Sequence, residues 1–181
     1  MVIILYYDRY RGIKMSLSVR EASVSEHAVL TDISFASKQY WNYPNEYFEI
    51  WKEELTISPA YIKSNVVYVA EVKGRVIGYI SLVELQTDFR AGNIILNKGF
   101  CLEHIFILPE YIGKGIGSSL IATLKEKCKE MKIAKIYIFS DPNAKGFYDK
   151  LEACYLGESP SNIEGRSVSV YALQINNVDK T

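Results

Sequence analysis

The chain has 181 residues, and Lys plus Arg equals Asp plus Glu at 21 each. This length suits one globular domain, and the balanced charge gives no argument for nucleic acid or a membrane surface as a partner. Only two histidines are present, and the three cysteines lack CxxC spacing. We therefore expect no metal site and no Ser-His-Asp triad, and we expect buried, reduced thiols in a cytoplasmic protein.

Residues 1–16 stand apart from the rest of the chain. Their apolar run, Val2 to Tyr7, is too short for a transmembrane helix and lacks the features of a signal peptide. Met15 precedes "SLSVREA", which reads like a domain start. Two interpretations stay open, an extra edge strand or an extension from an upstream start codon. We expect a single domain over residues 17–176 and a C-terminal tail at 177–181.

In the first half of the chain we expect a strand over 17–22, two helices and a hairpin. Ser23 or Ser25 caps the first helix, which runs to about Tyr40, and Pro44 takes a first-turn position in the second. Runs at 65–72 and 75–86 flank Lys73-Gly74, which predicts a β-hairpin. The two helices carry an aromatic cluster: Phe35, Tyr40, Trp41, Tyr43, Tyr47, Phe48 and Trp51.

The second half begins with a strand that ends at Leu108, followed by a glycine-rich loop, a helix and a strand at 134–139. This order predicts a βαβ unit with parallel strands. Asp141 and Pro142 open a short helix, and strands at 154–158 and 167–175 follow. The whole order predicts a mixed sheet with helices packed against it. The helix after the loop has one apolar face: Leu120, Ile121, Leu124, Cys128 and Met131.

The loop "LPEYIGKGIGSSL" places glycines at 113, 115 and 117. Glycine costs backbone entropy, so we expect a positive φ or a close approach to the main chain in return. A helix N-terminus attracts anions through its unpaired amides, and Lys114 adds a positive charge, so we predict a phosphate-type site rather than an empty tight turn. The spacing matches neither G-x-x-x-x-G-K-[ST] nor G-x-G-x-x-G, which makes both nucleotide interpretations poor.

Two segments carry a resemblance to a known family. "HIFILPEYIGKGIGSSL" and "DPNAKGFYDKLEA" resemble the acetyl-CoA-binding half of the GNAT superfamily of N-acetyltransferases, and the resemblance covers roughly residues 17–173. The family loop R/Q-x-x-G-x-G/A falls on residues 112–117, with Ile112 where Arg or Gln is usual. Downstream, Asp141 stands where Asn is usual, with Asn143 two residues on, and Glu152 replaces a glycine.

The resemblance implies a mixed α+β fold. Its sheet would be mostly antiparallel, with about six to seven strands, flanking helices and splayed fourth and fifth strands. The pantetheine arm of acetyl-CoA would lie between the splayed strands and bond to the main chain of one of them. The residues implied for binding acetyl-CoA are Ile105, Phe106, Ile107, Ile112, Gly113, Lys114, Gly115, Ile116, Gly117, Ser118, Asn143 and Tyr148.

The implied reaction moves an acetyl group from acetyl-CoA directly to a primary amine of a small molecule, a polyamine or a peptide. It needs a base, an acid and oxyanion stabilisation, but no covalent intermediate and no metal. Tyr148 matches the family tyrosine that protonates the leaving thiolate. Glu103 is the predicted base because it alternates with Ile105 and Ile107 along the strand. His104, on the opposite face, Glu84 and an ordered water are the alternatives.

Three further questions stay open. The departures at Ile112, Asp141 and Glu152 give some support to a rival function, an acyl-CoA-binding regulatory domain without catalysis. Some of the aromatic rings at 40–51 could contact an amine, and Glu46, Glu49, Glu53 and Glu54 would favour a cationic acceptor unless they form a solvated helix face. The last strand and the N-terminal stretch each offer a sheet edge at which two copies would form a homodimer.

Overall fold

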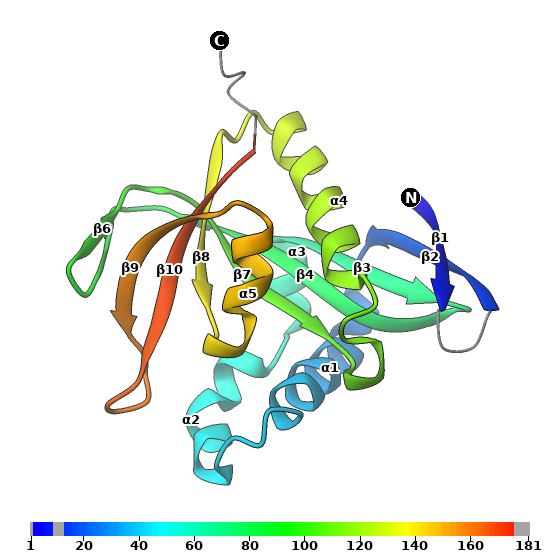
Figure 1. The fold of residues 1–181 in the computed structure, drawn as a ribbon, viewed down its shortest axis with the longest axis horizontal. Coiled ribbons are helices and arrows are strands. Elements are labelled where there is room, and N and C mark those ends of the chain that lie inside the picture. Colours follow the sequence, from blue (N-terminus) through cyan, green and yellow to red (C-terminus); the bar gives the residue numbers. More distant parts are fainter. Residues whose placement is uncertain (1, 9–12, 176–181) are drawn as a thin grey trace. The chain divides into compact units, whose positions relative to one another are not determined.

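The computed structural model describes residues 2–8 and 13–175, with side chains from Ser16 onward. The chain divides into two compact units. The first contains Met1–Ser81 and His104–Leu124, and the second contains Leu82–Glu103 and Lys125–Thr181. Each is described by itself, and Figure 1 labels the elements of both. None of the helices in the described residues is long and apolar enough to cross a membrane.

The first unit is built on neighbouring strands. These follow one another across the sheet as β1 (Val2–Asp8), β2 (Ile13–Glu21), β3 (Val66–Val72) and β4 (Arg75–Leu85). β2 is antiparallel both to β1 and to β3. β7 (Gly99–Ile107) adjoins β4, and the amide of Leu108 donates to the carbonyl of Ile77 at 2.8 Å. The predicted hairpin is confirmed, since Lys73 and Gly74 join β3 to β4 with φ of 52° and 77°.

Four helical segments of the first unit lie between β2 and β3: η1 (Val24–Glu26), α1 (His27–Gln39), α2 (Asn45–Leu55) and α3 (Pro59–Ser64). Ser23 is a cap as predicted, but of η1: its hydroxyl accepts from the Ser25 amide and Glu26 completes a capping box. α1 itself begins after Glu26 without a side-chain cap. The first-turn position predicted for Pro44 is wrong. Pro44 directly precedes α2, with an extended ψ of 141°. α3 was not expected from the sequence, although Ser58 caps it and Pro59 opens it.

The core of the first unit joins α1 and α3 to the strands. Eight apolar side chains form it: Leu30, Ile33, Ile57, Ile62, Val67, Val69, Val76 and Tyr79. Burying each such side chain contributes roughly 1.5–3 kcal/mol, so this cluster fixes the helices on β3 and β4. The Tyr79 hydroxyl, buried with its ring, is 2.7 Å from the Ser34 hydroxyl.

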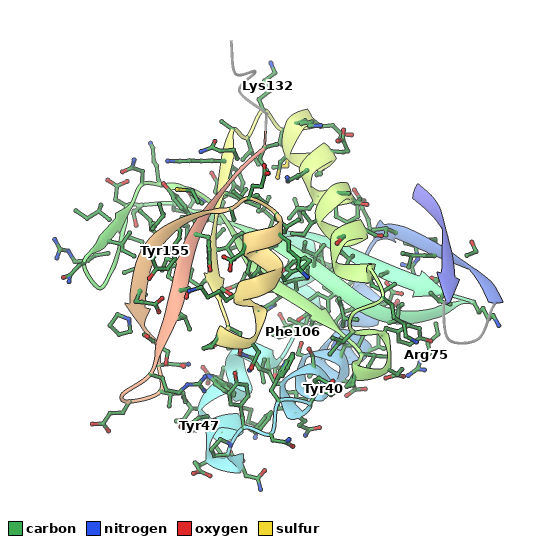
Figure 2. All side chains as sticks on the ribbon, in the orientation of Figure 1. Tyr40, Tyr47, Arg75, Phe106, Lys132 and Tyr155 are labelled. Carbon is green, nitrogen blue, oxygen red and sulfur yellow. The ribbon has the colours of Figure 1, made fainter. Side chains whose placement is uncertain are left out.

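A 3-10 turn η2 (Pro109–Tyr111) and the glycine loop lead into α4 (Ile116–Glu130). The predicted apolar face of α4 is found for Leu120, Ile121, Leu124 and Cys128, which are all buried. The prediction is wrong for Met131, which is 39% exposed. The cause is the end of the helix at Glu130, after which Lys132 (Figure 2) takes a left-handed φ of 58°.

The second unit has its own run of strands. Here β7 is followed across the sheet by β8 (Lys135–Ser140), β10 (Ser167–Gln174) and β9 (Cys154–Pro160). β10 is antiparallel to both β8 and β9, and these three strands lie side by side in Figure 1. η3 (Pro142–Ala144), capped by Asp141 as predicted, precedes α5 (Lys145–Lys150). A small hairpin of β5 (Phe89–Ala91) and β6 (Ile94–Leu96) was not predicted.

The predicted βαβ unit is confirmed, because β7 and β8 are parallel. Their register joins Cys101 to Tyr137 and Leu102 to Ile138 and goes no further within the described residues. On its other edge, β8 stays paired with β10 as far as Ser140. β7 and β8 therefore separate after Leu102. The predicted mixed, mostly antiparallel sheet with a splayed parallel pair is confirmed.

Candidate functional site

The glycine loop lies wholly in the first unit. Gly113 and Gly115 have φ of 76° and 82°, in the left-handed region where a side chain is strained. A Cβ placed on either would meet nothing within 4 Å. Glycine is therefore favoured at these two positions by the left-handed backbone conformation and not by a lack of space for a side chain. Gly117 lies in the first turn of α4 and, unlike Gly113 and Gly115, does not have a positive φ.

The left-handed turns leave the start of α4 with unpaired amides. The Ser119 amide donates to the Gly115 carbonyl at 3.1 Å, which is the first hydrogen bond of the helix. The amides of Ile116, Gly117 and Ser118 come before that bond, where a helix has no carbonyl to offer them. The side chain of Ile116 is only 1% exposed, so this residue can present a ligand with its amide alone. The loop thus has the geometry of an anion site.

The other loop residues predicted to bind the cosubstrate are half-buried. Lys114 holds its ammonium 5.5 Å from the ring centroid of Tyr111. Ile112 continues the chain in an extended conformation, and its amide donates to the Pro109 carbonyl at 3.2 Å. An Ile at this position has no polar group to offer a ligand. Any attraction of the loop for an anion therefore comes from Lys114 and the main chain.

The strand residues Ile105, Phe106 and Ile107 are also half-buried in the first unit. The Phe106 carbonyl is turned toward β4, where a Cβ on Gly78 would come within 2.9 Å of it. Because main-chain groups of neighbouring residues point to opposite sides of a strand, those of Ile105 and Ile107 point away from β4. Of the three predicted residues, Ile105 and Ile107 thus have main-chain groups on the side away from β4, whereas the carbonyl of Phe106 (labelled in Figure 2) faces β4.

His104 lies on the same strand and is 3% exposed. Its amide donates to the Ser81 hydroxyl at 3.2 Å, and its Nδ1 is 3.5 Å from the Tyr61 hydroxyl. Tyr61 and Ser81 are themselves joined at 2.7 Å. Burial, followed by the positive charge of Lys38, lowers the pKa of His104 to about 4. The imidazole is therefore neutral at neutral pH.

Sequence reasoning missed both partners of His104. Tyr61 lies on α3, for which Ser58 followed by Pro59 was the available signal. Ser81 interrupts an otherwise apolar strand and is fully buried. A polar residue at a buried strand position needs a hydrogen-bond partner, so it could have marked this place.

In the second unit, Tyr148 is 3% exposed on α5. Its ring lies 5.2 Å from that of Phe147 and 5.8 Å from that of Tyr171. Burial is the main cause that raises the pKa of Tyr148, and Cys101, Asp141 and Tyr171 add to it. The phenol therefore keeps its proton at neutral pH, which is the form that a general acid must have.

Asn143, two residues after Asp141, is exposed in the same unit. The Asp141 carboxylate accepts from the Asn143 amide at 3.0 Å and from its side-chain Nδ2 at 3.1 Å. This capping role explains why an Asp suits position 141. Glu103 and Glu84, the two carboxylates considered as bases, are both exposed. Glu152 has a left-handed φ of 57°, which fits the glycine expected there.

The aromatic cluster of α1 and α2 is already occupied by a cation. The Lys38 ammonium lies 4.6 Å from the ring centroid of Trp51 and 5.7 Å from that of Tyr43. Trp51 is 6% exposed, whereas Tyr40 is 50% exposed. The carboxylates of this region lie on an exposed face: Glu46, Glu49, Glu53 and Glu54.

The cysteines are free thiols. Cys101 and Cys128 are buried as predicted, but the prediction is wrong for Cys154, which is exposed. The reason is its position on β9, the last strand of its run, which has a neighbour on one side only. Within residues 2–8 and 13–175, no group of three or more His, Cys, Asp or Glu side chains is placed to hold a metal ion.

Comparisons with known proteins can be set beside this geometry. The sequence matches the model of the acetyltransferase (GNAT) family over residues 32–152. A search of the curated proteins gives no match. Among solved structures, a GCN5-related N-acetyltransferase (aminotransferase, class II) from Rhodopseudomonas palustris has a TM-score of 0.68 at 17% identity, over 96% of this chain and 98% of its own.

Two further solved structures contain the cosubstrate or its product. The PaiA N-acetyltransferase of Thermoplasma acidophilum, in complex with coenzyme A, has a TM-score of 0.62 at 22% identity, over 88% of this chain and 99% of its own. A GNAT family acetyltransferase of Brucella melitensis, in complex with acetyl-CoA, has a TM-score of 0.57 at 18% identity, over 88% of both chains. At these identities the likeness is one of fold.

Proposed function

Because this chain belongs to the GNAT family of acetyltransferases, we propose that it transfers an acetyl group from acetyl-CoA to the nitrogen of a primary amine. The observation that carries the proposal is the pair of left-handed glycines, Gly113 and Gly115, directly before the unpaired amides of α4. A phosphate group is the anion that such a helix start binds best.

The first unit supplies the binding groups for acetyl-CoA. In this proposal the amides of Ile116, Gly117 and Ser118 bind the pyrophosphate, and Lys114 contributes its charge. The pantetheine arm pairs with the main-chain groups of Ile105 and Ile107, in the manner of an added strand. In support, the solved structures from T. acidophilum and B. melitensis have a similar fold and contain coenzyme A and acetyl-CoA.

The acid is a separate assignment. We assign that role to Tyr148, which protonates the thiolate of coenzyme A as it leaves. Its place on α5, at the family's tyrosine position, supports the assignment, and its phenol is protonated at neutral pH. Asn143 would contact acetyl-CoA only after giving up the hydrogen bond from its side-chain Nδ2 to Asp141. Glu103 is the base predicted from the sequence, and His104, the next residue of the same strand, is an alternative to it.

The acceptor is a primary amine on a small molecule, a polyamine or a peptide. The rival function, a regulatory domain that binds acyl-CoA without catalysis, rested on Ile112, Asp141 and Glu152. Asp141 has an ordinary structural role as the cap of η3, so its presence does not favour the rival.

Titration calorimetry tests the proposal directly. The protein is titrated with acetyl-CoA, and in separate experiments with ATP and with NAD. We expect saturable binding of acetyl-CoA alone. Binding of ATP or NAD without binding of acetyl-CoA would contradict the proposal. The protein is then incubated with acetyl-CoA and a panel of primary amines, and free thiol is measured. Acetyl-CoA binding with no thiol release from any amine would favour the regulatory domain.

A further inference from the structure

The Nε2 of His104 is a buried side-chain atom with no hydrogen-bond partner. A polar atom left in this way costs roughly 1–3 kcal/mol, and such atoms are rare in folded proteins. The cost is accepted here in the middle of β7, directly before the strand residues that we propose to bind the pantetheine arm. An unpaired nitrogen at this place suggests a group that arrives with the substrates.

The opposite side of the imidazole ring is held in place. Tyr61 stacks on it with ring centroids 5.6 Å apart, and the Tyr61 hydroxyl lies 3.5 Å from Nδ1. If Nδ1–H donates to Tyr61, the Tyr61 hydroxyl donates in turn to Ser81 across 2.7 Å. Ser81 accepts the backbone amide of His104 as well, at 3.2 Å. In that arrangement, the lone pair of the imidazole lies on Nε2.

The surroundings favour the neutral form of the imidazole. Besides Tyr61, the rings of Tyr79 and Phe106 lie 5.9 and 5.5 Å away. The positive charge of Lys38 on α1 also disfavours protonation of the imidazole, because a second positive charge would then lie near it. Tyr61 from α3 and Ser81 from β4 each place a hydroxyl within hydrogen-bond distance of His104. A neutral imidazole with a lone pair is a group that can take up a proton.

We propose that His104, through Nε2, is the catalytic base that takes the proton from the acceptor amine; this rests on the acetyl transfer proposed above. As the amine nitrogen forms its bond to the thioester carbon, the N–H proton passes to Nε2. The C–S bond then breaks, and the thiolate takes a proton from Tyr148. The imidazolium returns its proton to water, and the tyrosinate regains one. Tyr61 and Ser81 are positioning residues that keep the lone pair on Nε2.

Access to Nε2 has a structural requirement. Tyr61 and Phe106 are only half-buried, whereas Tyr79 is fully buried. Because Tyr61 holds the imidazole, a small amine reaches Nε2 by displacing the half-buried ring of Phe106. The positive charge of Lys38 disfavours an ammonium group beside His104, so the acceptor enters this place as the uncharged amine.

Kinetics of three variants test the assignment, with the amine that gives the fastest thiol release in the panel. His104→Gln places an amide near the position of Nε2 that cannot accept a proton, and we expect kcat to fall about 100-fold. His27→Gln, at the other histidine of the chain, is the matched control and keeps kcat within twofold. Calorimetry should give the same acetyl-CoA affinity for both. Added imidazole should restore part of kcat to His104→Ala, which a purely structural role would not produce.

Nitrogen NMR of the uniformly ¹⁵N-labelled protein gives a second readout that does not depend on turnover. The spectrum of His27→Gln assigns the signals of His104. We expect a neutral ring with its proton on Nδ1 between pH 5 and 8. A proton on Nε2, or unchanged kcat in His104→Gln, would overturn the inference, as would a larger loss in Glu103→Gln than in His104→Gln. Failure of the wild-type protein to bind acetyl-CoA would instead remove the proposed function on which it rests.

Discussion

Tyr148 is a buried phenol that keeps its proton at neutral pH, as a proton donor must, while the burial that raises its pKa also makes it a weaker acid than an exposed tyrosine. A tyrosine with an ordinary pKa would also be protonated at neutral pH. The added effect of burial is that the tyrosinate, once formed, is poorly stabilised and recovers its proton readily. A role in turnover and a role in binding can be separated by removing the hydroxyl alone.

Tyr148→Phe should lower kcat about 100-fold and leave the affinity for acetyl-CoA within twofold of the wild type, because the ring and its packing are kept. Tyr171→Phe is the matched control: it is also buried, it lies 5.8 Å from Tyr148, and its hydroxyl donates to Asp149 at 3.2 Å. That variant should lose about 1 kcal/mol of unfolding free energy and keep kcat. Equal losses of kcat and affinity in Tyr148→Phe would contradict the acid role.

Sequence signals at single residues succeeded where the cause is local. Ser23 and Asp141 cap their helices because a side-chain oxygen reaches an amide two or three residues away. The signals failed where the cause lies elsewhere in the fold. The direction of the Phe106 carbonyl depends on the register of β7 with Gly78, and the exposure of Cys154 depends on the place of β9 in the sheet. Neither fact is present in the neighbouring sequence.

At the scale of elements, the three residues from Gly113 to Gly115 both turn the chain and leave amides free for a ligand. The left-handed backbone turns the chain, and the turn leaves the first amides of α4 without partners. Alanine at either glycine keeps the space open, since nothing lies within 4 Å of the added Cβ. The conformation itself is what an alanine would strain.

Gly113→Ala and Gly115→Ala should each lower the unfolding free energy by about 1 kcal/mol and weaken acetyl-CoA binding roughly tenfold, because the backbone leaves the left-handed region. Gly146→Ala is the matched control: its Cβ also meets nothing within 4 Å, its φ is not positive, and it lies in α5. There the same change should raise stability by about 0.5 kcal/mol. Chemical denaturation and calorimetry measure both quantities, and unaltered binding in the two loop variants would contradict the proposed phosphate site.

Elements predicted from the sequence were those with a strong local pattern. The hairpin at Lys73-Gly74 and the strand–loop–helix–strand segment both have long apolar runs bounded by glycine. α3, β5 and β6 were missed because they have six, three and three residues, too few to show a period. α3 carries Tyr61, so a missed short helix also meant a missed partner of His104.

At the scale of the whole molecule, burial of His104 links global stability to pH. The folded state holds its pKa at about 4, against 6.5 for an exposed histidine. Below pH 6.5 the unfolded chain therefore binds a proton that the folded chain does not. The free energy of unfolding is fully retained above that pH and falls as the pH drops toward 4.

This contribution should amount to about 3 kcal/mol between pH 7 and pH 4, since each unit of pKa difference is worth about 1.4 kcal/mol. Carboxylates also titrate in this range, so the measurement is a difference. Urea unfolding is followed at several pH values for the wild type and for His104→Gln, which has no titrating group at this position. The wild type should lose more stability than the variant as the pH falls from 6.5 to 4. Parallel curves would mean that the imidazole is already protonated in the folded protein near pH 6.5. A charged imidazole would also contradict its role as a base, so this measurement of stability bears directly on the mechanism.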